Sequence, residues 1–289
     1  MHGGPTFPRA LLALTIAGGL CGAPGPAAAL MAGTLPDTPT KRSIALDEHS
    51  DWNSVGCVVV GGSPFTGVLI DRQFVLTASH VPGHQPPDHV RFVLTPGARA
   101  RSFDAAAVII FPSASFPYDD LAIVRLKKAV PGWVRIYPIY TARVSLGQRI
   151  TMLGAGGSGN GDRGVTVSAR EDVMRIGENV IDALVPAVDK SGRVSSFYLY
   201  DFDGPSGNGS LGGPTIGNTV ETMVAPGDSG SPVFARIDGR TWLVGINTLG
   251  APSAAGRTMD SKFGNVGGGM LLSYPPFIDW IEAVIGHKP

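Results

Sequence analysis

Short apolar runs separated by turn residues dominate the chain from about residue 55 onward. Most runs are four to six residues long, contain β-branched side chains and are bounded by Gly, Pro or Asp, which is the pattern of β-strands. Helical periodicity is confined to the end of the chain, where Phe277, Ile278, Ile281 and Ile285 predict a short amphipathic helix over about 276–286. Many short strands without a βαβ alternation predict an all-β protein built as an antiparallel barrel or sandwich. The predicted strands cover residues 57–60, 66–70, 74–76, 90–94, 107–111, 121–126, 150–153, 165–167, 180–184, 197–202, 233–237, 242–246 and 270–273.

The composition agrees with this fold class and excludes several functions. Gly and Pro number 40 and 24 among 289 residues, which suits many turns between short strands. Lys plus Arg and Asp plus Glu both number 23, so the chain lacks the electrostatic footprint of a protein that binds nucleic acid or an anionic membrane. Paired cysteine motifs for metal binding are absent from the sequence. We therefore expect no cofactor, no metal ion and no nucleic-acid partner.

The first 29 residues have the three parts of a secretory signal peptide. Arg9 supplies the positive start, residues 10–20 are apolar, and small residues at 27–29 offer a cleavage site. Gly and Pro interrupt the apolar stretch too early for a membrane span, so a secreted or periplasmic protein without a membrane anchor is expected. Because Cys21 lies in this segment, only Cys57 would remain after its removal, which excludes an intrachain disulfide. Residues 30–54 are predicted to be a leader or short propeptide.

Three short segments contain candidate catalytic side chains. His80 ends the segment FVLTASH, so a strand would fix its backbone at the edge of a cleft. Asp120 leads directly into an apolar strand, and Asp119 beside it is a competing acid. Ser229 is flanked by glycines in PGDSGSP, where the N–H groups of Gly227 and Ser229 would form an oxyanion hole. Taken singly, these features are equally typical of a surface histidine, a turn acid and a Gly/Ser turn.

In the order His, Asp, Ser, the three segments resemble those of trypsin-like (chymotrypsin-family) serine proteases of the exported bacterial type. The resemblance also includes GVLI at 67–70, DLAIVRL at 120–126, LVGI at 243–246 and FIDWI at 277–281, so that it spans roughly residues 55–285. It implies one domain over 55–289 that is made of two packed six-stranded antiparallel β-barrels and a C-terminal helix. The barrels would cover about 55–140 and about 145–275.

The resemblance also implies a role for each candidate side chain. Ser229 would be the nucleophile, His80 the general base, and Asp120 the acid that orients His80, because in this family the acid adjoins the Leu-Ala pair. The nucleophile elbow of α/β-hydrolases is disfavoured, since Ser231 replaces its second glycine and a strand-like segment follows. The expected activity is that of a secreted serine endopeptidase acting on protein or peptide substrates as a monomer. The alternative is an inactive protease-like binding module, which usually lacks a member of the triad.

The primary specificity pocket would lie on residues that are mostly apolar. Trypsins carry an acid six residues before the nucleophile, and that position is Met223 here. An apolar pocket disfavours Lys or Arg, because burying an unpaired cation is costly, so cleavage after apolar residues is expected. Glutamyl-specific relatives share Ser231 but tend to carry a His where this chain has Asn247, which argues against Glu specificity. Loop-length differences over 204–221 would change which residue takes the position assigned here to Met223. The other residues expected at the pocket are Val224, Thr248, Leu249 and Gly250, with Gly269 as a candidate for a further wall.

The sequence leaves the activation route open. In zymogen-activated relatives the acid at the position of Asp228 pairs with a newly freed N-terminus, and the nearest analogous cleavage site here follows Arg42. Alternatively, an arginine side chain pairs with Asp228 and no cleavage is required. The acids at 201 and 203 hint at a calcium loop, but Pro205 interrupts the EF-hand-like spacing, so a plain turn is favoured.

Overall fold

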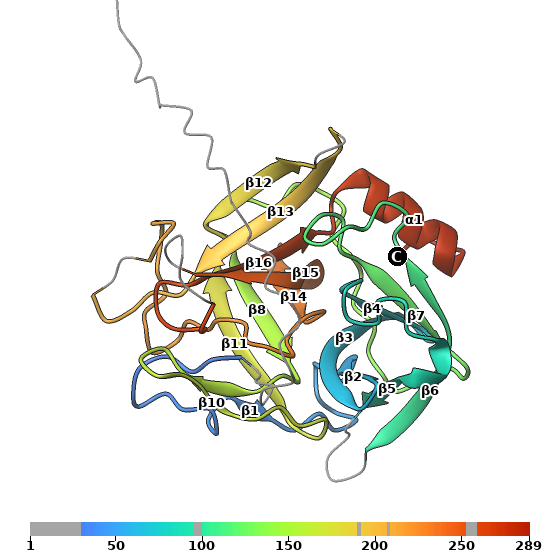
Figure 1. Cartoon of the computed structure of the whole chain (residues 1–289), viewed down its shortest axis with the longest axis horizontal. Coiled ribbons are helices and arrows are strands. Elements are labelled where there is room, and N and C mark those ends of the chain that lie inside the picture. Colours follow the sequence, from blue (N-terminus) through green and yellow to red (C-terminus); the bar gives the residue numbers. More distant parts are fainter. Residues whose placement is uncertain (1–29, 95–99, 190–191, 207–208, 253–258) are drawn as a thin grey trace, which may run out of the picture.

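The computed structural model describes residues 30–94, 100–189, 192–206, 209–252 and 259–289, so the predicted signal peptide lies outside the described residues. Over these ranges the chain forms sixteen strands, one short 3-10 helix and a single α-helix at its C-terminal end. The prediction of an all-β fold with a C-terminal helix is therefore confirmed. The strands divide into two halves that lie next to each other in Figure 1, with α1 beside the first half.

The first half is a closed antiparallel barrel of six strands in the order β2-β3-β4-β7-β6-β5. Side chains alternate along each strand, so that Val58, Leu69 and Phe92 pack in the barrel interior while Val59 and Val68 pack against the second half. Both faces are buried along β2 and along most of β7, so these two strands are nearly continuous apolar runs, whereas β6 is largely exposed or half-buried. The bounds are β2 (Val55–Val60), β3 (Ser63–Asp71), β4 (Phe74–Thr77), η1 (Pro87–His89), β5 (Val90–Leu94), β6 (Arg101–Ile110) and β7 (Ala122–Leu126).

The second half differs from the predicted six-stranded barrel. It is an eight-stranded antiparallel sheet in the order β1-β11-β8-β14-β15-β16-β13-β12, and strand pairing does not close it. A separate two-stranded hairpin is formed by β9 and β10. The bounds are β1 (Ser43–Ile44), β8 (Arg149–Gly154), β9 (Ser158–Asn160), β10 (Gly164–Val167), β11 (Met174–Val180), β12 (Ala183–Val188), β13 (Val194–Asp201), β14 (Pro232–Ile237), β15 (Arg240–Ala251) and β16 (Val266–Leu271).

Side chains join β11 to β13 at the place where a closed barrel would have a strand pair. The Asn179 amide nitrogen donates to the carbonyl oxygens of Asp201 and Thr222, each at 2.8 Å. The backbone N–H of Asp201 donates to the Asp182 carboxyl at 3.0 Å. The sheet therefore curls around its own core, and β1 and β12 extend it at either end.

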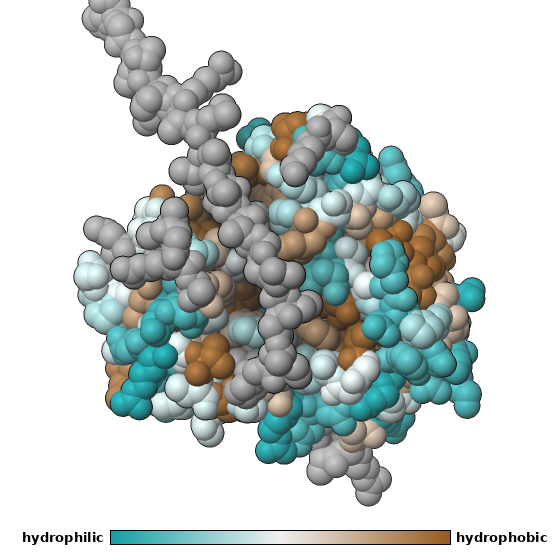
Figure 2. Space-filling model, viewed as in Figure 1, coloured by the Kyte–Doolittle hydropathy of each residue, from teal (hydrophilic) through white to brown (hydrophobic). Residues whose placement is uncertain are grey.

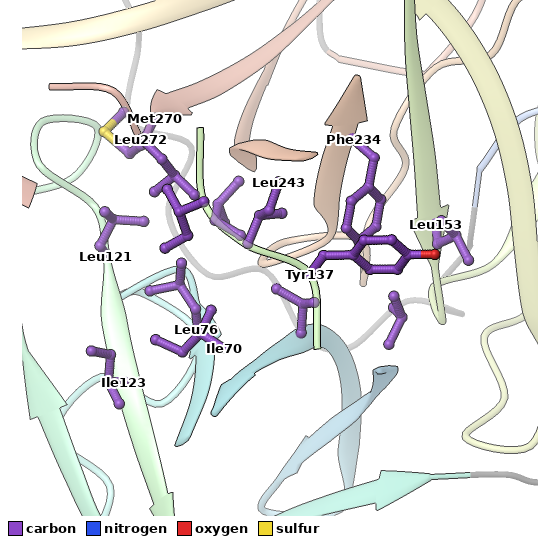
Figure 3. Close-up of a cluster of buried hydrophobic side chains, with 14 of the residues drawn as sticks. Ile70, Leu76, Leu121, Ile123, Tyr137, Leu153, Phe234, Leu243, Met270 and Leu272 are labelled. Atoms are coloured by element: carbon purple, nitrogen blue, oxygen red, sulfur yellow. The ribbon is translucent and has the colours of Figure 1, made fainter. Parts of the chain in front are cut away.

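A continuous hydrophobic core joins the two halves and the helix (Figure 3). It brings Ile70, Leu76 and Ile123 of the barrel together with Phe234 and Leu243 of the sheet. Helix α1 (Pro275–Ile285) adds its buried residues Phe277, Ile281 and Ile285 to this core. It begins at two prolines and ends at Gly286, which adopts the left-handed conformation that terminates many helices. This core fixes the halves relative to each other, which matters because the candidate residues are divided between them.

Residues 30–44, which the sequence predicts as part of a leader or short propeptide, pack into the second half. Leu30, Met31 and Ala32 are completely buried. The Met31 N–H donates to the Met223 carbonyl, and β1 pairs with β11. In Figure 1 this blue segment follows the outer side of β10 and β11. It contributes to the core of the second half in the intact chain.

The molecular surface mixes hydrophilic and hydrophobic residues. On the face drawn in Figure 2, hydrophobic residues lie in patches that hydrophilic residues separate. Among the described residues, the large hydrophobic side chains that are exposed come from several loops and strands, and they are Leu35, Phe116, Leu146, Val188 and Val194. Among the described residues, no helix has the length and apolar character needed to cross a bilayer.

Candidate active site

The three candidate catalytic residues come from different elements and meet at the boundary between the halves. His80 follows β4 in a turn in which the Val81 and Gly83 N–H groups donate to the carbonyls of Ala78 and Ser79. Asp120 comes shortly before β7, and Ser229 lies in the turn before β14. Each side chain is therefore attached to a strand whose position the core fixes.

The side chains of Ser229, His80 and Asp120 form a continuous hydrogen-bonded chain. The Ser229 Oγ lies 2.7 Å from His80 Nε2, and His80 Nδ1 lies 2.6 Å from Asp120 Oδ2. Asp120 is completely buried, whereas 29% of the His80 side chain is exposed. The imidazole thus bridges a buried carboxylate and a hydroxyl that faces solvent, an arrangement suited to proton transfer from that hydroxyl.

Asp119 does not reach His80. Its Oδ2 accepts a hydrogen bond from the Ser113 hydroxyl at 2.7 Å, and its backbone N–H donates to the Ser195 hydroxyl. Its φ is 51°, so the chain reverses here and turns the two successive carboxylates in different directions. Of the two acids that the sequence offers, Asp120 is the one in contact with His80.

The turn that contains Ser229 is held from both halves. Thr66 of β3 donates its hydroxyl to the Gly227 carbonyl and its N–H to the Ser229 carbonyl. The Asp228 carbonyl accepts a hydrogen bond from the Ser231 N–H. Because the Asp228 carbonyl and the Ser229 N–H belong to the same trans peptide bond, they point in opposite directions, so the Ser229 N–H points away from Ser231. Within the described part of the chain, neither the Gly227 N–H nor the Ser229 N–H has a protein acceptor. Two donors beside the Ser229 hydroxyl are what an oxyanion hole requires.

Gly230 is required by this geometry. Its φ is +84°, and a Cβ there would lie 2.0 Å from the Thr77 hydroxyl oxygen and 2.2 Å from the Thr66 carbonyl oxygen. Any side chain would push the turn away from the barrel and move Ser229 from His80. The glycine after the serine is therefore explained by the close approach of the two halves.

The family model of the trypsin-like peptidase domain matches residues 65–246, a range that includes His80, Asp120 and Ser229. This chain belongs to the trypsin-like peptidase family. It is therefore a protease of the chymotrypsin family, which acts on peptide substrates. No curated protein matches the chain.

Asp228 of this trypsin-like peptidase is buried and engaged by backbone donors. Its carboxyl accepts hydrogen bonds from the N–H groups of Gly156 and Ala225 at 3.2 and 3.0 Å. Burial raises the pKa of Asp228 well above the usual carboxyl range, although these donors and the nearby Arg175 act in the opposite direction. No basic group in the described ranges comes within 4.0 Å of this carboxyl.

Neither Arg42 nor Arg175 forms an ion pair with Asp228. Arg42 pairs with Asp37 instead, and it also donates to the carbonyls of Val220 and Glu221. Arg175 is buried and interacts with Asp228 only electrostatically. Burial lowers the pKa of Arg175, and the Nε of its guanidinium donates to the Pro39 carbonyl.

A cavity of about 150 Å³ lies directly beside Ser229. Four of the five residues that the sequence assigns to the specificity pocket line this cavity, and they are Val224, Thr248, Leu249 and Gly250. Met223 does not: its side chain is completely buried in the core of the second half. Gly269 does not line the cavity either; it packs against the backbone of β15, where a Cβ would lie 1.9 Å from the Ile246 carbonyl oxygen. The cavity wall that the sequence places at Met223, six residues before Ser229, is thus formed by the next residue, Val224.

Met259, Ala225 and Pro226 complete the apolar lining. The sequence gives no sign of Met259, because it is distant from every motif and comes from a different loop. Gly250 makes room for it, since a Cβ at Gly250 would lie 2.5 Å from the Met259 methyl group.

Asn247 forms the polar end of the cavity, and its amide is fully engaged within the protein. Its Oδ1 accepts from the hydroxyls of Tyr198 and Tyr200 at 2.9 and 3.1 Å. Its Nδ2 donates to the Ser231 hydroxyl at 2.9 Å and approaches the Met152 sulfur at 3.4 Å. Burial raises the pKa of both tyrosines well above the usual value, so the hydroxyls remain donors.

Two residues that the sequence did not mark also contact the site. Phe116 lies edge-on to the His80 ring, with 5.2 Å between the ring centroids, and about half of it is exposed. Ser79 donates its hydroxyl to Asp120. Only the second could have been suspected from the sequence, because Ser79 directly precedes His80.

The acids at 201 and 203 belong to a buried acidic group rather than to an open loop. The Asp201 carboxyl accepts from the Leu211 N–H, and the Asp203 N–H donates to the Glu221 carboxyl at 2.9 Å. Burial and the neighbouring carboxylates raise the pKa of Asp182 to about 7, and burial also raises that of Asp201. In the described parts of the chain, no three His, Cys, Asp or Glu side chains are arranged to hold a metal ion.

Proposed function

We propose that this trypsin-like peptidase is a serine endopeptidase that cleaves peptide bonds through an acyl-enzyme. The observation that carries the proposal is the unbroken chain of contacts from the Ser229 hydroxyl through His80 to the buried Asp120 carboxylate. A serine hydroxyl alone is a weak nucleophile at neutral pH, and an adjacent oriented base is what activates it.

The reaction follows from the role of each group. Ser229 Oγ attacks the scissile carbonyl carbon while His80 Nε2 takes its proton, and Asp120 holds the tautomer with the proton on Nδ1. The carbonyl oxygen becomes an oxyanion that the N–H groups of Gly227 and Ser229 stabilise. His80 then gives its proton to the leaving amine as the C–N bond breaks. Water, deprotonated by His80, attacks the acyl-enzyme ester, and Ser229 regains its proton as the acid product leaves.

The lining of the cavity supports cleavage after apolar residues. Val224, Ala225, Leu249 and Met259 offer no counter-charge to a Lys or Arg side chain, and an unpaired buried cation is costly. Among the described residues that line the cavity, Asp228 is the one with a carboxyl; backbone donors occupy it, and its raised pKa disfavours the anion. The Asn247 amide is likewise engaged, so it offers no free donor to a Glu side chain. Profiling with a peptide library tests this preference, and dominant cleavage after Arg, Lys or Glu would refute it.

We also propose that the enzyme is exported, because residues 1–29 have the pattern of a secretory signal peptide. N-terminal sequencing of protein recovered outside the cytoplasm should give a start close to residue 30. Full-length protein that still begins at Met1 and stays in the cytoplasm would contradict the proposal.

Labelling with a fluorophosphonate is the direct test of the catalytic proposal. The reagent should attach to Ser229, and Ser229→Ala should lose both labelling and about 10⁶-fold in kcat, as loss of the nucleophile costs in subtilisin. Asp120→Asn should lower kcat by about 10⁴-fold because the imidazole then adopts the wrong tautomer. Asp119→Asn and the exposed His84→Ala are matched controls that should retain activity. A folded wild-type protein that neither reacts nor hydrolyses peptides would instead be a protease-like binding module.

A further inference from the structure

The Asp120 carboxylate has a third hydrogen-bond donor besides the two from His80. The Ser79 hydroxyl donates to Asp120 Oδ1 at 2.5 Å, and the His80 N–H donates to the same oxygen at 2.9 Å. Asp120 Oδ2 is left to His80 Nδ1. The carboxylate is completely buried, and Ser79 is 7% exposed, so water contributes little to their interaction.

The turn after β4 holds Ser79 in place. Its carbonyl accepts the Gly83 N–H at 2.9 Å, and the Val81 N–H closes on the preceding Ala78 carbonyl. The backbone around Ser79 is therefore fixed, and only χ1 and the rotation of the hydroxyl must be ordered to aim the O–H at Asp120. By contrast, the buried hydroxyl of Ser54 has no partner among the residues described, so it offers a matched control for the loss of a buried hydroxyl.

We infer that Ser79 is a positioning residue for the proposed hydrolysis, acting on His80 through Asp120. A buried carboxylate needs donors to remain ionised, and a donor on Oδ1 also fixes the rotation of the carboxylate about its Cβ–Cγ bond. With that rotation fixed, Oδ2 stays aligned with the Nδ1–H of His80, which keeps Nε2 directed at Ser229. The benefit grows in the transition state, when His80 becomes an imidazolium that the carboxylate must stabilise. This inference rests on the proposed function.

The kinetic test is the substitution Ser79→Ala. Hydrogen bonds to charged groups are strong enough for their loss to change a rate by about tenfold or more, so we expect kcat to fall about tenfold. KM should stay within twofold, because Ser79 does not line the substrate cavity. Ser79→Thr, which keeps a hydroxyl, should recover most of kcat. Ser54→Ala removes a buried hydroxyl without a partner and should change neither constant. A Ser79→Ala enzyme with kcat within twofold of wild type would overturn the inference.

A double-mutant cycle with Asp120→Ala separates positioning from general structural damage. In the Asp120→Ala background there is no carboxylate to position, so adding Ser79→Ala should change the residual kcat by less than twofold. The same tenfold loss in both backgrounds would show that Ser79 acts elsewhere and would overturn the inference.

The cycle also has a readout that does not depend on activity. For a protein of this size, loss of the hydrogen bond should lower Tm by about 2–4 °C in the wild-type background and by less than about 1 °C once Asp120 is absent. If the wild-type protein neither hydrolyses peptides nor reacts with fluorophosphonate, the proposed function fails. If it is active but the two residues show no coupling in kcat or Tm, only the role of Ser79 fails.

Discussion

Arg42 anchors residues 30–44 to the second half, and its removal gives the sharpest test of whether this segment is structural. The guanidinium donates through Nε and Nη2 to the Asp37 carboxyl at 2.8 and 2.5 Å. Its Nη2 also donates to the carbonyls of Val220 and Glu221, both at 2.8 Å. Those carbonyls belong to the loop that continues into the cavity wall at Val224. Arg42 therefore joins the N-terminal segment to the substrate side of the molecule.

The size of the effect follows from burial. The side chains of Arg42 and Asp37 are only 7% and 11% exposed. Arg42→Ala would remove the counter-charge from a buried carboxylate, which would keep the Gly33 N–H as a donor, and would remove the Arg42 donor from two carbonyls. Removing one partner of a buried ion pair typically costs about 3–5 kcal/mol. At roughly 2–4 °C per kcal/mol for a chain of this size, Tm should fall by about 10 °C. By comparison, Arg170 pairs with Asp172 in an exposed site, so its loss should change the stability little.

Thermal and urea unfolding of four proteins would measure this effect, namely wild type, Arg42→Ala, Asp37→Ala and the double variant. The double variant should lose less stability than the sum of the two single changes, because it leaves no unpaired charge. Arg170→Ala is the control for loss of a surface arginine. An Arg42→Ala protein that loses no more stability than Arg170→Ala would refute the reasoning, and the segment would then be a dispensable leader. Cleavage after Arg42 in folded protein should also be slow, since a protease would have to extract this buried side chain.

Two further predictions concern pH and the support of the Ser229 turn. Burial raises the pKa of Asp182 to about 7 from an unfolded value of 3.8, so between these pH values the folded state keeps a proton that the unfolded state releases. The protonated Asp182 therefore contributes to the free energy of unfolding fully below about pH 4, and this contribution is lost as the pH rises through about 7. Asp182→Asn should therefore flatten the fall in unfolding free energy between pH 4 and 8, and an unchanged slope in urea titrations would contradict the assignment. Gly154→Ala would place a Cβ 2.0 Å from Asp228 Oδ1, so kcat/KM should fall by at least tenfold, whereas Gly132→Ala meets open space and should be neutral in the same assay.

The sequence predicts those parts of the site that depend on local context. His80 and Asp120 adjoin barrel strands with apolar patterns, and Ser229 lies in a turn whose glycine is required by close packing. The C-terminal helix is also local, because its apolar spacing and its proline and glycine boundaries fix it within a residue at each end. These features could be found without knowing which segments meet in space.

The features that the sequence missed depend on contacts between distant segments. Residues 30–44 are polar and turn-rich, yet their few apolar side chains at 30–32 are completely buried because the second half offers a place for them. Met259, in a loop, reaches the cavity because Gly250 of β15 leaves space for it. The second half is not closed by strand pairing because the Asn179 side chain and Asp182 occupy the gap. None of these contacts has a periodic signal along the chain.

Alignment of the proposed catalytic residues depends on how the two halves are joined, since His80 and Asp120 belong to one half and Ser229 to the other. No disulfide links the two halves, because Cys57 is the only cysteine in the described ranges. Cys57 is buried, and burial raises its thiol pKa to about 12. The hydrophobic core between the halves holds them together, but apolar packing tolerates small sliding movements. Thr66 adds directional contacts: on β3 of the barrel it binds the carbonyls of Gly227 and Ser229, and its hydroxyl accepts the Ala155 N–H at 2.9 Å. Thr66 therefore connects the turn that contains Ser229 to the half that contains His80. Hydrophobic packing sets the distance between the two halves, and the hydrogen bonds of Thr66 fix the position of Ser229 along the interface.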